Sequence, residues 1–445
     1  MNKYVQNVLE SLERKNAHEA EFLQAAEEIL SSLDKVISMH PEYEQQSLLE
    51  RFVEPERVIQ FRVPWVDDSG KLRVNRAFRV QFNGAIGPYK GGMRFHPSVN
   101  LSTLKFLAME QTLKNALTGI AMGGGKGGAD FDPHGKSEGE VMRFCQSLMT
   151  ELYRHIGANI DVPAGDIGVG AREIGFMFGQ YKRIVGEYSG VLTGKGLSYG
   201  GCLGRKEATG YGLCYFTEAM LNHAGDSLKG KRVVLSGSGN VALYAAQKAK
   251  ELGATPVAMS DSQGFVVDEN GIDIELMKDI KENRRERISA YAHEKGLSYH
   301  EGSQGIWEVP CDVALPCATQ NELPLNGAKA LVKNGVKAVA EGANMPSTKD
   351  AVHYLKQNNV LFAPAKAANA GGVSVSGLEM GQNAQFVAFT QKEVDAKLHA
   401  IMENIFATVS KAASLYGSSP TDYAAGANAA GFLKVADAML AQGCV

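Results

Sequence analysis

The sequence predicts an α/β protein built from two domains, and three observations support this prediction. The chain has 445 residues, which at about 150 residues per domain gives two or three domains. Short apolar runs typical of strands alternate with longer amphipathic stretches typical of helices. A glycine- and serine-rich stretch at 190–204 interrupts this alternation, and we place a domain boundary there.

Composition and charge narrow the class further. The chain carries 46 Lys and Arg against 49 Asp and Glu, a net charge of −3, so it lacks the basic excess that neutralises nucleic-acid phosphates. A hydrophobic content of 44% with 21% charged residues is typical of folded domains and argues against disorder. The 49 glycines occur in clusters, which predicts loops where the backbone turns tightly or approaches a ligand.

The cysteines and the N-terminal segment indicate a cytoplasmic protein with reduced thiols. None of the six cysteines has CxxC or zinc-finger spacing, and no HExxH motif or EF-hand loop occurs, so we expect no metal. The N-terminal segment lacks the apolar core of a signal peptide. No apolar run approaches the ~18 residues of a membrane span, so we expect no membrane partner. The nearly balanced charge predicts that there is no nucleic-acid partner either.

The first half begins with helices and continues with strands. Residues 1–50 have apolar residues at helical spacing. Two segments at 58–63 and 78–82 alternate apolar and polar residues and lie on either side of the turn sequence Asp67–Gly70. Together these two segments predict a pair of strands.

Two longer helices are predicted after these strands, at 101–118 and 137–156. The second begins with Ser137 and has Glu140 three residues later, which predicts a capping box. The alternation of strands and helices makes this half of the chain α/β.

A strand–turn–helix–strand unit begins the second half. The strand Val233–Leu235 leads into a GxGxxA sequence and a helix of small residues, and Val257–Met259 forms the next strand. Glycines at these spacings let the backbone turn tightly and approach a pyrophosphate at the positive end of the helix. We therefore predict a Rossmann-like dinucleotide-binding domain in which Gly237 and Gly239 form the turn and the helix follows with Asn240 and Val241. Further strands are expected at 313–315, 336–339 and 360–362, and helices at 391–410 and 421–442.

The second strand of this unit ends at Ser260, Asp261 and Ser262. An acidic residue here usually accepts a hydrogen bond from the ribose 2′-hydroxyl, which favours NAD. Serines with a nearby cation can instead hold a 2′-phosphate, and a basic segment at 281–287 follows. This rule alone leaves both cofactors open.

Three lysines near glycines, Lys90, Lys114 and Lys126, form a second group of candidates. The stretch around Lys126 fails as a P-loop because Gly127 follows the lysine where Ser or Thr is required. Such lysines are either surface residues in flexible loops or acid–base groups in a tight pocket. In a pocket, burial and neighbouring cations lower the lysine pKa.

Two further polar residues stand in glycine-rich sequences. Asp166, among small residues, either caps a turn or is partly buried beside a partner such as a lysine. Ser198 lies in a GxSxG sequence, the pattern of a hydrolase nucleophile. Neither flank of that sequence has the required strand or helix, so we discard this interpretation.

Seven sequence motifs, in this order along essentially the whole chain, resemble the hexameric glutamate dehydrogenases of the Glu/Leu/Phe/Val dehydrogenase family. The resemblance implies reversible oxidative deamination of L-glutamate to 2-oxoglutarate and ammonium with NAD(P). The seven motifs are Tyr89–Pro97, Met122–Gly128, Pro163–Gly168, Glu207–Gly212, Pro316–Asn321, Glu341–Pro346 and Asn369–Val373.

The resemblance also implies roles for individual residues. The catalytic lysine that activates water corresponds to Lys126, and the acid that shuttles protons to the amino nitrogen corresponds to Asp166. The substrate carboxylates correspond to two sets of residues: Gln111, Lys114 and the Gly165 backbone at the α-carboxylate, and Lys90 and Ser376 at the distal one. Residues corresponding to further cofactor and cleft contacts are Thr209, Asn240, Ala318, Asn344 and Asn369.

For the cofactor, the Ser-Asp-Ser sequence resembles the NADP-preferring members, and Lys281 aligns with a lysine near the 2′-phosphate. The resemblance therefore favours NADP, with NAD as the second choice. Lys206 stands where the family usually has proline, which loosens the start of the following helix.

The nearest alternative is a dehydrogenase of a hydrophobic amino acid, whose members have apolar residues at the positions of Lys90 and Ser376. A non-catalytic nucleotide-binding paralogue would lack Lys126 or Asp166, and both are present. The architecture implied is a substrate and oligomerisation domain at 1–200 and a cofactor domain at 201–420. A cleft separates these domains, the helix at 421–445 returns to the first, and the assembly is a homo-oligomer, a hexamer.

Overall fold

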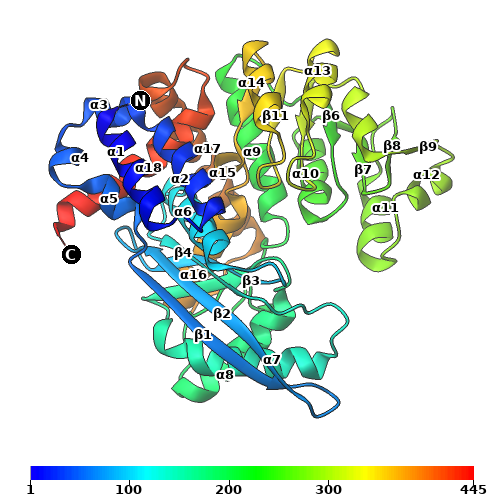
Figure 1. Cartoon of the computed structure of the whole chain (residues 1–445). Helices are drawn as coiled ribbons and strands as arrows, with labels where there is room; N and C mark the ends of the chain where they lie inside the picture. Colours follow the sequence, from blue (N-terminus) through cyan, green and yellow to red (C-terminus); the bar gives the residue numbers. More distant parts are fainter. Residues whose placement is uncertain (1, 445) are drawn as a thin grey trace. The chain divides into compact units, whose positions relative to one another are not determined.

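The computed structural model describes residues 2–444, which form a two-domain α/β fold as predicted (Figure 1). By their contacts, the residues group into two compact units. Unit 1 comprises Met1–Leu203, Val375–Val394 and Asn428–Val445, and unit 2 comprises Gly204–Ser374 and Asp395–Ala427. The segment Val375–Val394 thus belongs to unit 1 although it lies late in the sequence. The predicted domain limits at 200 and 420 stay predictions.

Unit 1 begins with a group of helices, as the apolar spacing predicted. Asn2 caps the first of them by accepting a hydrogen bond from the Tyr4 N–H at 2.8 Å. These helices are α1 (Lys3–Lys15), α2 (Ala20–Ser32), α3 (Asp34–Met39), α4 (Glu42–Gln45) and α5 (Leu48–Val53).

A mixed five-stranded sheet forms the centre of unit 1, in the order β1-β2-β4-β3-β5. The predicted strand pair is confirmed: β1 and β2 form an antiparallel hairpin around the predicted turn. Strand β3 lies between β4 and β5 and is parallel to both. The strands are β1 (Arg57–Val66), β2 (Leu72–Asn83), β3 (Tyr89–Phe95), β4 (Gly123–Ala129) and β5 (Asp161–Gly165).

The glycine clusters at 89–95 and 123–129 are strands, and the prediction that clustered glycines form loops is wrong there. Every residue of β4 is buried. A Cβ built on Gly127 would lie 2.3 Å from the Met93 sulfur, and one on Gly124 would lie 1.8 Å from the Thr112 hydroxyl. Glycine serves here because neighbouring elements approach the strand closely.

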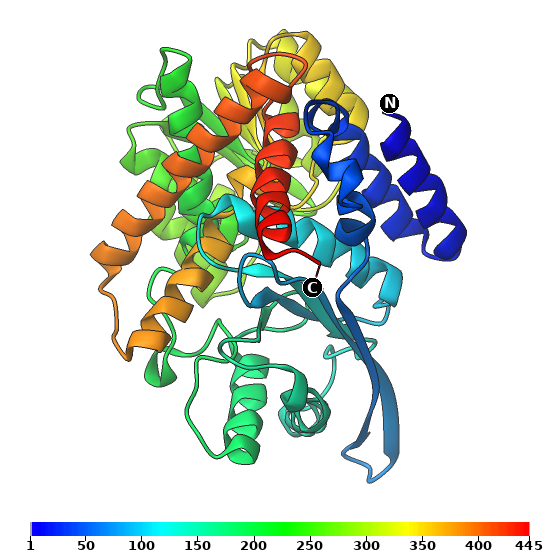
Figure 2. The ribbon, with the colours of Figure 1, turned by 90° about the vertical axis from the view of Figure 1, so that its left-hand side faces the viewer.

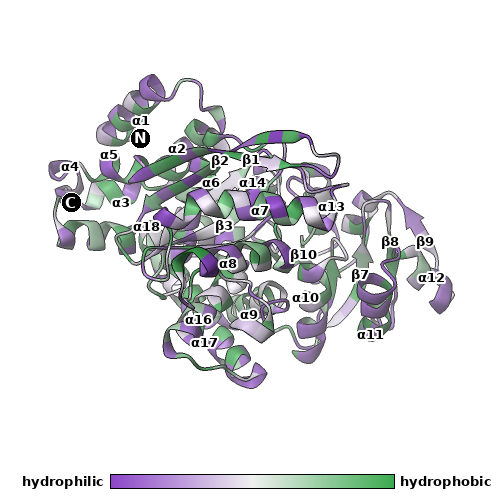
Figure 3. Cartoon of the chain, turned by 90° about the horizontal axis from the view of Figure 1, so that it is seen from below, coloured by the Kyte–Doolittle hydropathy of each residue, from purple (hydrophilic) through white to green (hydrophobic). Residues whose placement is uncertain are grey.

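Helices α6 (Leu101–Leu117), α7 (Glu138–Leu152) and α8 (Ala171–Val185) complete most of unit 1. The predicted capping box of Ser137 and Glu140 is confirmed: each side chain accepts a hydrogen bond from the other residue's backbone N–H. Helix α7 carries hydrophilic and hydrophobic residues in turn, as its colouring shows (Figure 3).

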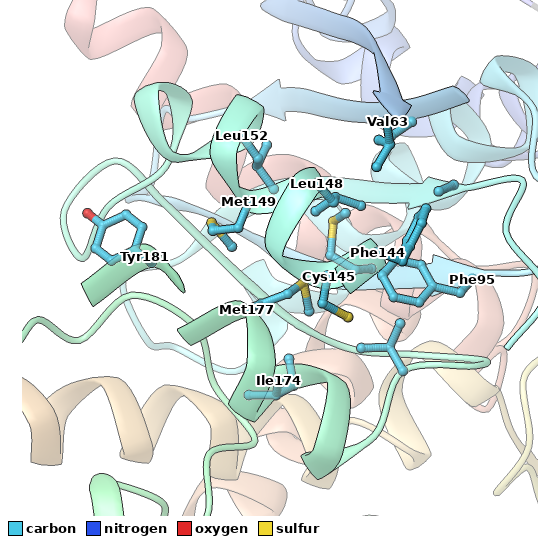
Figure 4. Close-up of a cluster of buried hydrophobic side chains, with 14 of the residues drawn as sticks. Val63, Phe95, Phe144, Cys145, Leu148, Met149, Leu152, Ile174, Met177 and Tyr181 are labelled. Atoms are coloured by element: carbon cyan, nitrogen blue, oxygen red, sulfur yellow. The ribbon is translucent and has the colours of Figure 1, made fainter. Parts of the chain in front are cut away.

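The buried side chains of α7 and α8 pack with strand residues into one core of unit 1 (Figure 4). Phe144 stacks on Phe131 with ring centroids 3.8 Å apart and meets Phe95 edge to face at 5.1 Å. In Figure 4 the Tyr181 hydroxyl points away from the labelled apolar side chains. The strand residues of this core come from β1, β2, β3 and β4, so the core joins α7 and α8 to four of the five strands.

Unit 2 contains a seven-stranded sheet in the order β12-β11-β10-β6-β7-β8-β9. The strands β12 to β7 are parallel, and β8 and β9 add antiparallel strands at one edge. The strands are β6 (Arg232–Leu235), β7 (Thr255–Ser260), β8 (Gly264–Val267), β9 (Tyr299–Glu301), β10 (Val313–Leu315), β11 (Ala338–Ala340) and β12 (Leu361–Ala363).

The helices of unit 2 follow the predicted α/β alternation. The predicted strand–turn–helix–strand unit is confirmed as β6, α10 (Asn240–Glu251) and β7. The other helices include α9 (Ala208–His223), α11 (Ile274–Lys278), α12 (Ser289–Lys295), α13 (Leu325–Lys333), α14 (Lys349–Gln357), α15 (Ala365–Ala368), α16 (Gly371–Gln385) and α17 (Gln391–Tyr416). Helix α16 continues into unit 1 from Val375.

The last helix, α18 (Tyr423–Gln442), belongs to unit 1 from Asn428 onward. Phe432 of this helix meets Tyr43 and Phe52 edge to face, and Asn428 Nδ2 donates to Ser32 Oγ at 2.8 Å. The C-terminal helix therefore packs on the N-terminal helices (Figure 2). Across residues 2–444, no helix combines the length and the apolar character needed to cross a membrane.

Candidate active site

Strands β3, β4 and β5 bring together candidate residues that lie far apart in the sequence. Lys90 is on β3, Lys126 on β4, and Asp166 directly follows Gly165, the last residue of β5. The Lys126 Nζ lies 3.3 Å from the Asp166 Oδ2. Of the two interpretations of Asp166, a turn cap or an acid partly buried beside a lysine, the structure supports the second, since its side chain is 19% exposed.

Glycines let these strands approach each other at the candidate site. A Cβ built on Gly91 would lie 1.7 Å from the Gly125 carbonyl oxygen, and one on Gly92 would lie 2.8 Å from the Asp166 Cβ. Separations this short exclude any side chain at either position. The glycines that flank Lys90 and Lys126 therefore allow the strands to pack closely around the site and do not act as flexible linkers.

The structure adds Arg94, a site residue to which the sequence analysis gave no role. Arg94 is on β3, and its Nε donates a 2.7 Å hydrogen bond to the Asp166 Oδ2 that Lys126 also approaches. One carboxylate oxygen thus faces two cations. Arg94 lies inside a motif that carries the family resemblance, but only the pairing of β3 with β5 shows that it reaches Asp166.

The charges and the burial of this cluster shift both pKa values. Burial lowers the pKa of the Lys126 ammonium, Asp166 opposes that shift, and the positive charges of Arg94 and Arg79 lower the pKa further. Burial raises the pKa of the Asp166 carboxyl, but Lys126 and Arg94 lower it more, so it ends below its usual range. Burial and neighbouring cations thus lower the lysine pKa as expected for a pocket, and the cations are the arginines Arg94 and Arg79.

Arg79 is itself held in place by a fully buried ion pair with Asp161. Its Nε donates to Asp161 Oδ2 at 2.9 Å, and its Nη1 donates to the Gly91 carbonyl at 3.1 Å. Gln81 Nε2 donates to the same Asp161 oxygen at 3.1 Å. This network connects β2, β3 and β5 and keeps the positive charge of Arg79 close enough to Lys126 to lower its pKa.

Helix α6 places Gln111 and Lys114 beside the strands. Gln111 Nε2 donates to Asn115 Oδ1 at 2.7 Å, and Asn115 Nδ2 donates to the carbonyls of Lys90 at 3.0 Å and Gly123 at 2.6 Å. These bonds fix α6 against β3 and against the start of β4. The half-buried Lys114 lies on the same helix, one turn after Gln111.

Ser376 also belongs to unit 1, although it follows the cofactor residues in the sequence. It is buried on α16, next to Gly377. A Cβ built on Gly377 would lie 2.7 Å from Ile120 and 3.2 Å from Met122, which directly precede β4. Helix α16 therefore packs against the segment that leads to Lys126. The five proposed substrate-binding residues and the two catalytic candidates, Lys126 and Asp166, all lie in unit 1.

Ser198, the serine of the discarded GxSxG sequence, is exposed on the short 3-10 helix Leu197–Tyr199. No strand precedes this turn, and no α-helix directly follows it. The geometry of a hydrolase nucleophile is absent there.

In unit 2 the sequence order of the strands reverses between β6 and β10, and the carboxyl ends of parallel strands at such a point bind ligands. Gly237 follows β6 with φ +84°, and its backbone N–H donates to Ser260 Oγ at 2.9 Å. A Cβ on Gly237 would lie 3.0 Å from Ala318, which follows β10, whereas one on Gly239 would meet nothing within 4 Å. Helix α10 then begins at Asn240.

Three further candidate cofactor residues of unit 2, Asn344, Asn369 and Thr209, each lie in close contact with a neighbouring residue. Asn369 Nδ2 donates to Asn344 Oδ1 at 2.9 Å. A Cβ on Gly372 would lie 2.6 Å from the Thr209 hydroxyl oxygen. The resemblance had grouped Asn344 with Asn369, and the structure places them side by side.

Asp261 is held by its own loop and by the backbone of Ile288. Its Oδ1 accepts hydrogen bonds from the N–H groups of Gln263 at 2.9 Å and Gly264 at 3.2 Å, and its Oδ2 accepts from the Ile288 N–H at 3.2 Å. The adjacent Ser262 hydroxyl accepts from Arg287 Nη1 at 2.8 Å. A serine with a cation beside it is the arrangement that suits a phosphate, and it singles out Arg287 from the predicted basic segment.

Lys281 precedes Arg287 in the same basic segment and lies on the π-turn Asp279–Asn283. Its Nζ donates to the Glu286 carbonyl at 2.8 Å. Lys206 forms an ion pair with Glu282 of the same turn, 2.8 Å from Nζ to Oε1. Helix α9 begins two residues after Lys206 without the usual proline, and this ion pair attaches its start to the turn.

Two family models match the chain. Residues 200–443 match the Glutamate/Leucine/Phenylalanine/Valine dehydrogenase family, and residues 55–183 match the Glu/Leu/Phe/Val dehydrogenase dimerisation domain.

Curated relatives are similar over the full length. The NADP-specific glutamate dehydrogenase of Salmonella typhimurium is 59% identical over 446 residues, and the alignment covers 99% of both chains. The NAD-specific glutamate dehydrogenase of Clostridium symbiosum is 55% identical over 449 residues, covering 100% of this chain and 99% of that protein.

Solved structures give the same result for the fold. Plasmodium falciparum glutamate dehydrogenase superposes with a TM-score of 0.96 at 52% identity, covering 100% of this chain and 95% of that one. A hetero-hexameric glutamate dehydrogenase from Thermus thermophilus superposes with a TM-score of 0.81 at 27% identity, covering 93% of this chain and 98% of that one.

Proposed function

The chain belongs to the Glu/Leu/Phe/Val dehydrogenase family, and we propose that Lys126 and Asp166 carry out its reaction on a substrate held by the lysines of unit 1. The protein is an NADP-dependent glutamate dehydrogenase, which interconverts L-glutamate with 2-oxoglutarate and ammonium. The observation that carries the residue assignment is the buried cluster in which Lys126 Nζ and Arg94 Nε both face one Asp166 oxygen.

Two separately placed cationic groups suit a substrate with two carboxylates. Lys90 and Ser376 bind the distal carboxylate, and Lys114, Gln111 and the Gly165 backbone bind the α-carboxylate. Charge-assisted hydrogen bonds at both ends fix the orientation of the α-carbon. A hydrophobic amino acid offers no second carboxylate to Lys90, which is buried, so the unit favours glutamate over that alternative substrate.

Lys126 and Asp166 divide the proton chemistry between them. The lowered pKa of Lys126 makes its neutral amine more accessible than that of an ordinary lysine, and this amine activates a water molecule as a general base. Asp166 remains a carboxylate because Lys126 and Arg94 stabilise its charge, so it can accept a proton from the substrate amino nitrogen and return it.

The cofactor residues of unit 2 fit NADP. The open backbone at Gly239 and the start of α10 suit a pyrophosphate, and NADP when bound accepts or supplies the hydride. Asp261 already accepts three backbone hydrogen bonds, which occupy most of its acceptor sites and favour Ser262 and Arg287 as the groups that distinguish the cofactors. Ser262 and Arg287 hold the 2′-phosphate, with Lys281 nearby. Thr209, Ala318, Asn344 and Asn369 line the nicotinamide end.

We further propose that the protein forms a homohexamer in the cytoplasm. The matched dimerisation domain supports self-association, and the hetero-hexameric relative from Thermus thermophilus supports six subunits. Sedimentation velocity of the purified protein tests this proposal. A monomer or dimer at micromolar concentration would contradict it.

The function is tested by following NADPH or NADH absorbance at 340 nm with 2-oxoglutarate and ammonium. NADPH oxidation should exceed NADH oxidation. Lys126→Ala should lower the rate by a factor of at least about 100. Lys136→Ala, an exposed lysine of the same unit, serves as the control and should behave as the unsubstituted protein. Undiminished turnover by Lys126→Ala would overturn the catalytic assignment.

A further inference from the structure

A second ion pair in unit 1 is buried completely and has no part in the proposed reaction. Lys195 Nζ lies 2.9 Å from Glu379 Oε1, and both side chains are 0% exposed. Burial lowers the pKa of the Lys195 ammonium, although the Glu379 charge opposes that shift. Burying two charges is costly, so a pair retained in a core calls for a physical reason.

The pair joins a short loop to helix α16. Glu379 accepts hydrogen bonds from the backbone N–H of Gly194 at 2.9 Å and of Lys195 at 3.3 Å. Lys195 Nζ also donates to the Leu192 carbonyl. Leu192 and Gly194 both have positive φ, 67° and 85°, so the loop holds an unusual backbone shape around the Glu379 carboxylate.

Both ends of this connection lead to the proposed substrate site. Glu379 lies one helical turn after Ser376 on α16, so the two side chains are on the same helix face. On the loop side, the Thr193 N–H donates to the Pro163 carbonyl of β5 at 3.0 Å, and β5 ends at Gly165. The pair thus joins the helix of Ser376 to the strand that leads to Asp166.

Two amides extend the same attachment along α16. Gln382 Nε2 donates to the Gly201 carbonyl at 3.0 Å, and Asn383 Nδ2 donates to the Gly200 carbonyl at 2.7 Å. With Glu379, these bonds hold one face of α16 against the loop of residues 192–201. Rotation of the helix about its axis would break all of them and would turn Ser376 away.

We propose that Lys195 and Glu379 are a positioning pair that fixes the rotation of α16 and thereby aims the Ser376 hydroxyl at the distal carboxylate of the substrate. The pair contributes to the choice of a dicarboxylate and has no contact with the reacting atoms. This inference rests on the role proposed for Ser376. Replacing both members of a buried ion pair by apolar residues is often neutral for stability, so the specificity effect is separable from folding.

The test compares substituted full-length enzymes on glutamate and on norvaline, whose side chain has no carboxylate. Two variants change the pair: the single variant Glu379→Gln and the double variant Lys195→Met with Glu379→Met. Two more test Ser376: Ser376→Ala by itself, and Ser376→Ala combined with Glu379→Gln. Glu19→Gln is the matched control because Glu19 pairs with Lys105 in unit 1 at 8% and 7% side-chain exposure. Measured are kcat and KM for both amino acids, KM for NADP, and the unfolding midpoint.

We expect both Glu379 variants to lower the glutamate-to-norvaline ratio of kcat/KM by about tenfold, mainly through KM for glutamate, with KM for NADP unchanged. Ser376→Ala should give a similar loss, and its combination with Glu379→Gln should add little, because both act through one hydroxyl. Glu19→Gln should leave the ratio unchanged.

A ratio equal to that of Glu19→Gln in either folded Glu379 variant would overturn the proposal. Failure of both Glu379 variants to fold would also overturn it, because the pair would then serve folding. An unchanged ratio in Ser376→Ala would remove its premise while glutamate turnover stood. Absence of glutamate turnover in the unsubstituted enzyme would instead overturn the proposed function.

Discussion

Replacing Arg94 by Met should move the acidic limb of the pH–activity profile to higher pH. The Arg94 Nε donates a 2.7 Å hydrogen bond to Asp166, and hydrogen bonds to charged groups contribute about 1.5–3 kcal/mol. Losing a contribution of this size removes much of the stabilisation of the ionised carboxylate, so the pKa of Asp166 should rise. The same positive charge lowers the pKa of Lys126, so its removal raises that pKa too.

Both shifts have the same sign, because activity needs ionised Asp166 and neutral Lys126. The assay is kcat/KM for glutamate, followed at 340 nm from acidic to alkaline pH, with circular dichroism to verify folding. Arg73→Met is the matched control, since Arg73 Nε donates to Asp67 Oδ2 at 2.8 Å in the hairpin of β1 and β2. An acidic limb of Arg94→Met that coincides with that of Arg73→Met would refute the reasoning.

Three further predictions concern specificity, the cofactor and the core. Lys90→Leu should lower kcat/KM for glutamate about 10- to 100-fold more than for norvaline in steady-state assays, since only glutamate has a carboxylate for Lys90, and equal losses would contradict its role. Arg287→Ala should raise KM for NADPH about tenfold and leave KM for NADH nearly unchanged, because NADH has no 2′-phosphate; equal changes in both would count against the phosphate contact. Phe144→Ala should lower the free energy of unfolding by about 3–5 kcal/mol in urea titrations, since Phe144 stacks on Phe131 in a fully buried cluster, and a loss under about 1 kcal/mol would show that the core refills the cavity.

Several elements could be predicted from the sequence because their causes are local. The Ser137–Glu140 capping box and the hairpin around Asp67–Gly70 depend on residues a few positions apart. The GxGxxA turn depends on glycine backbone freedom at Gly237, and it lies as predicted between β6 and α10. The substrate and cofactor residues themselves came from the resemblance, and their roles stay proposals.

The strands β3 and β4 show where local rules fail. Glycine is unfavourable in strands, so glycine clusters predict loops. In this fold the clusters are strands because Thr112, Met93 and the paired strand leave no room for side chains. The sequence does not contain that crowding as a local signal, since the crowding residues come from other elements.

The sequence by itself determined the α/β class, the dinucleotide turn and the candidate lysines, because each follows from periodicity or from short spacings. Only the tertiary structure decided that Arg94 reaches Asp166, that Asp261 accepts a hydrogen bond from the Ile288 N–H, and that Ser376 belongs to unit 1 with Lys195 and Glu379. These features depend on strand register and on contacts between residues far apart in the chain. Such contacts exist only once the chain has folded.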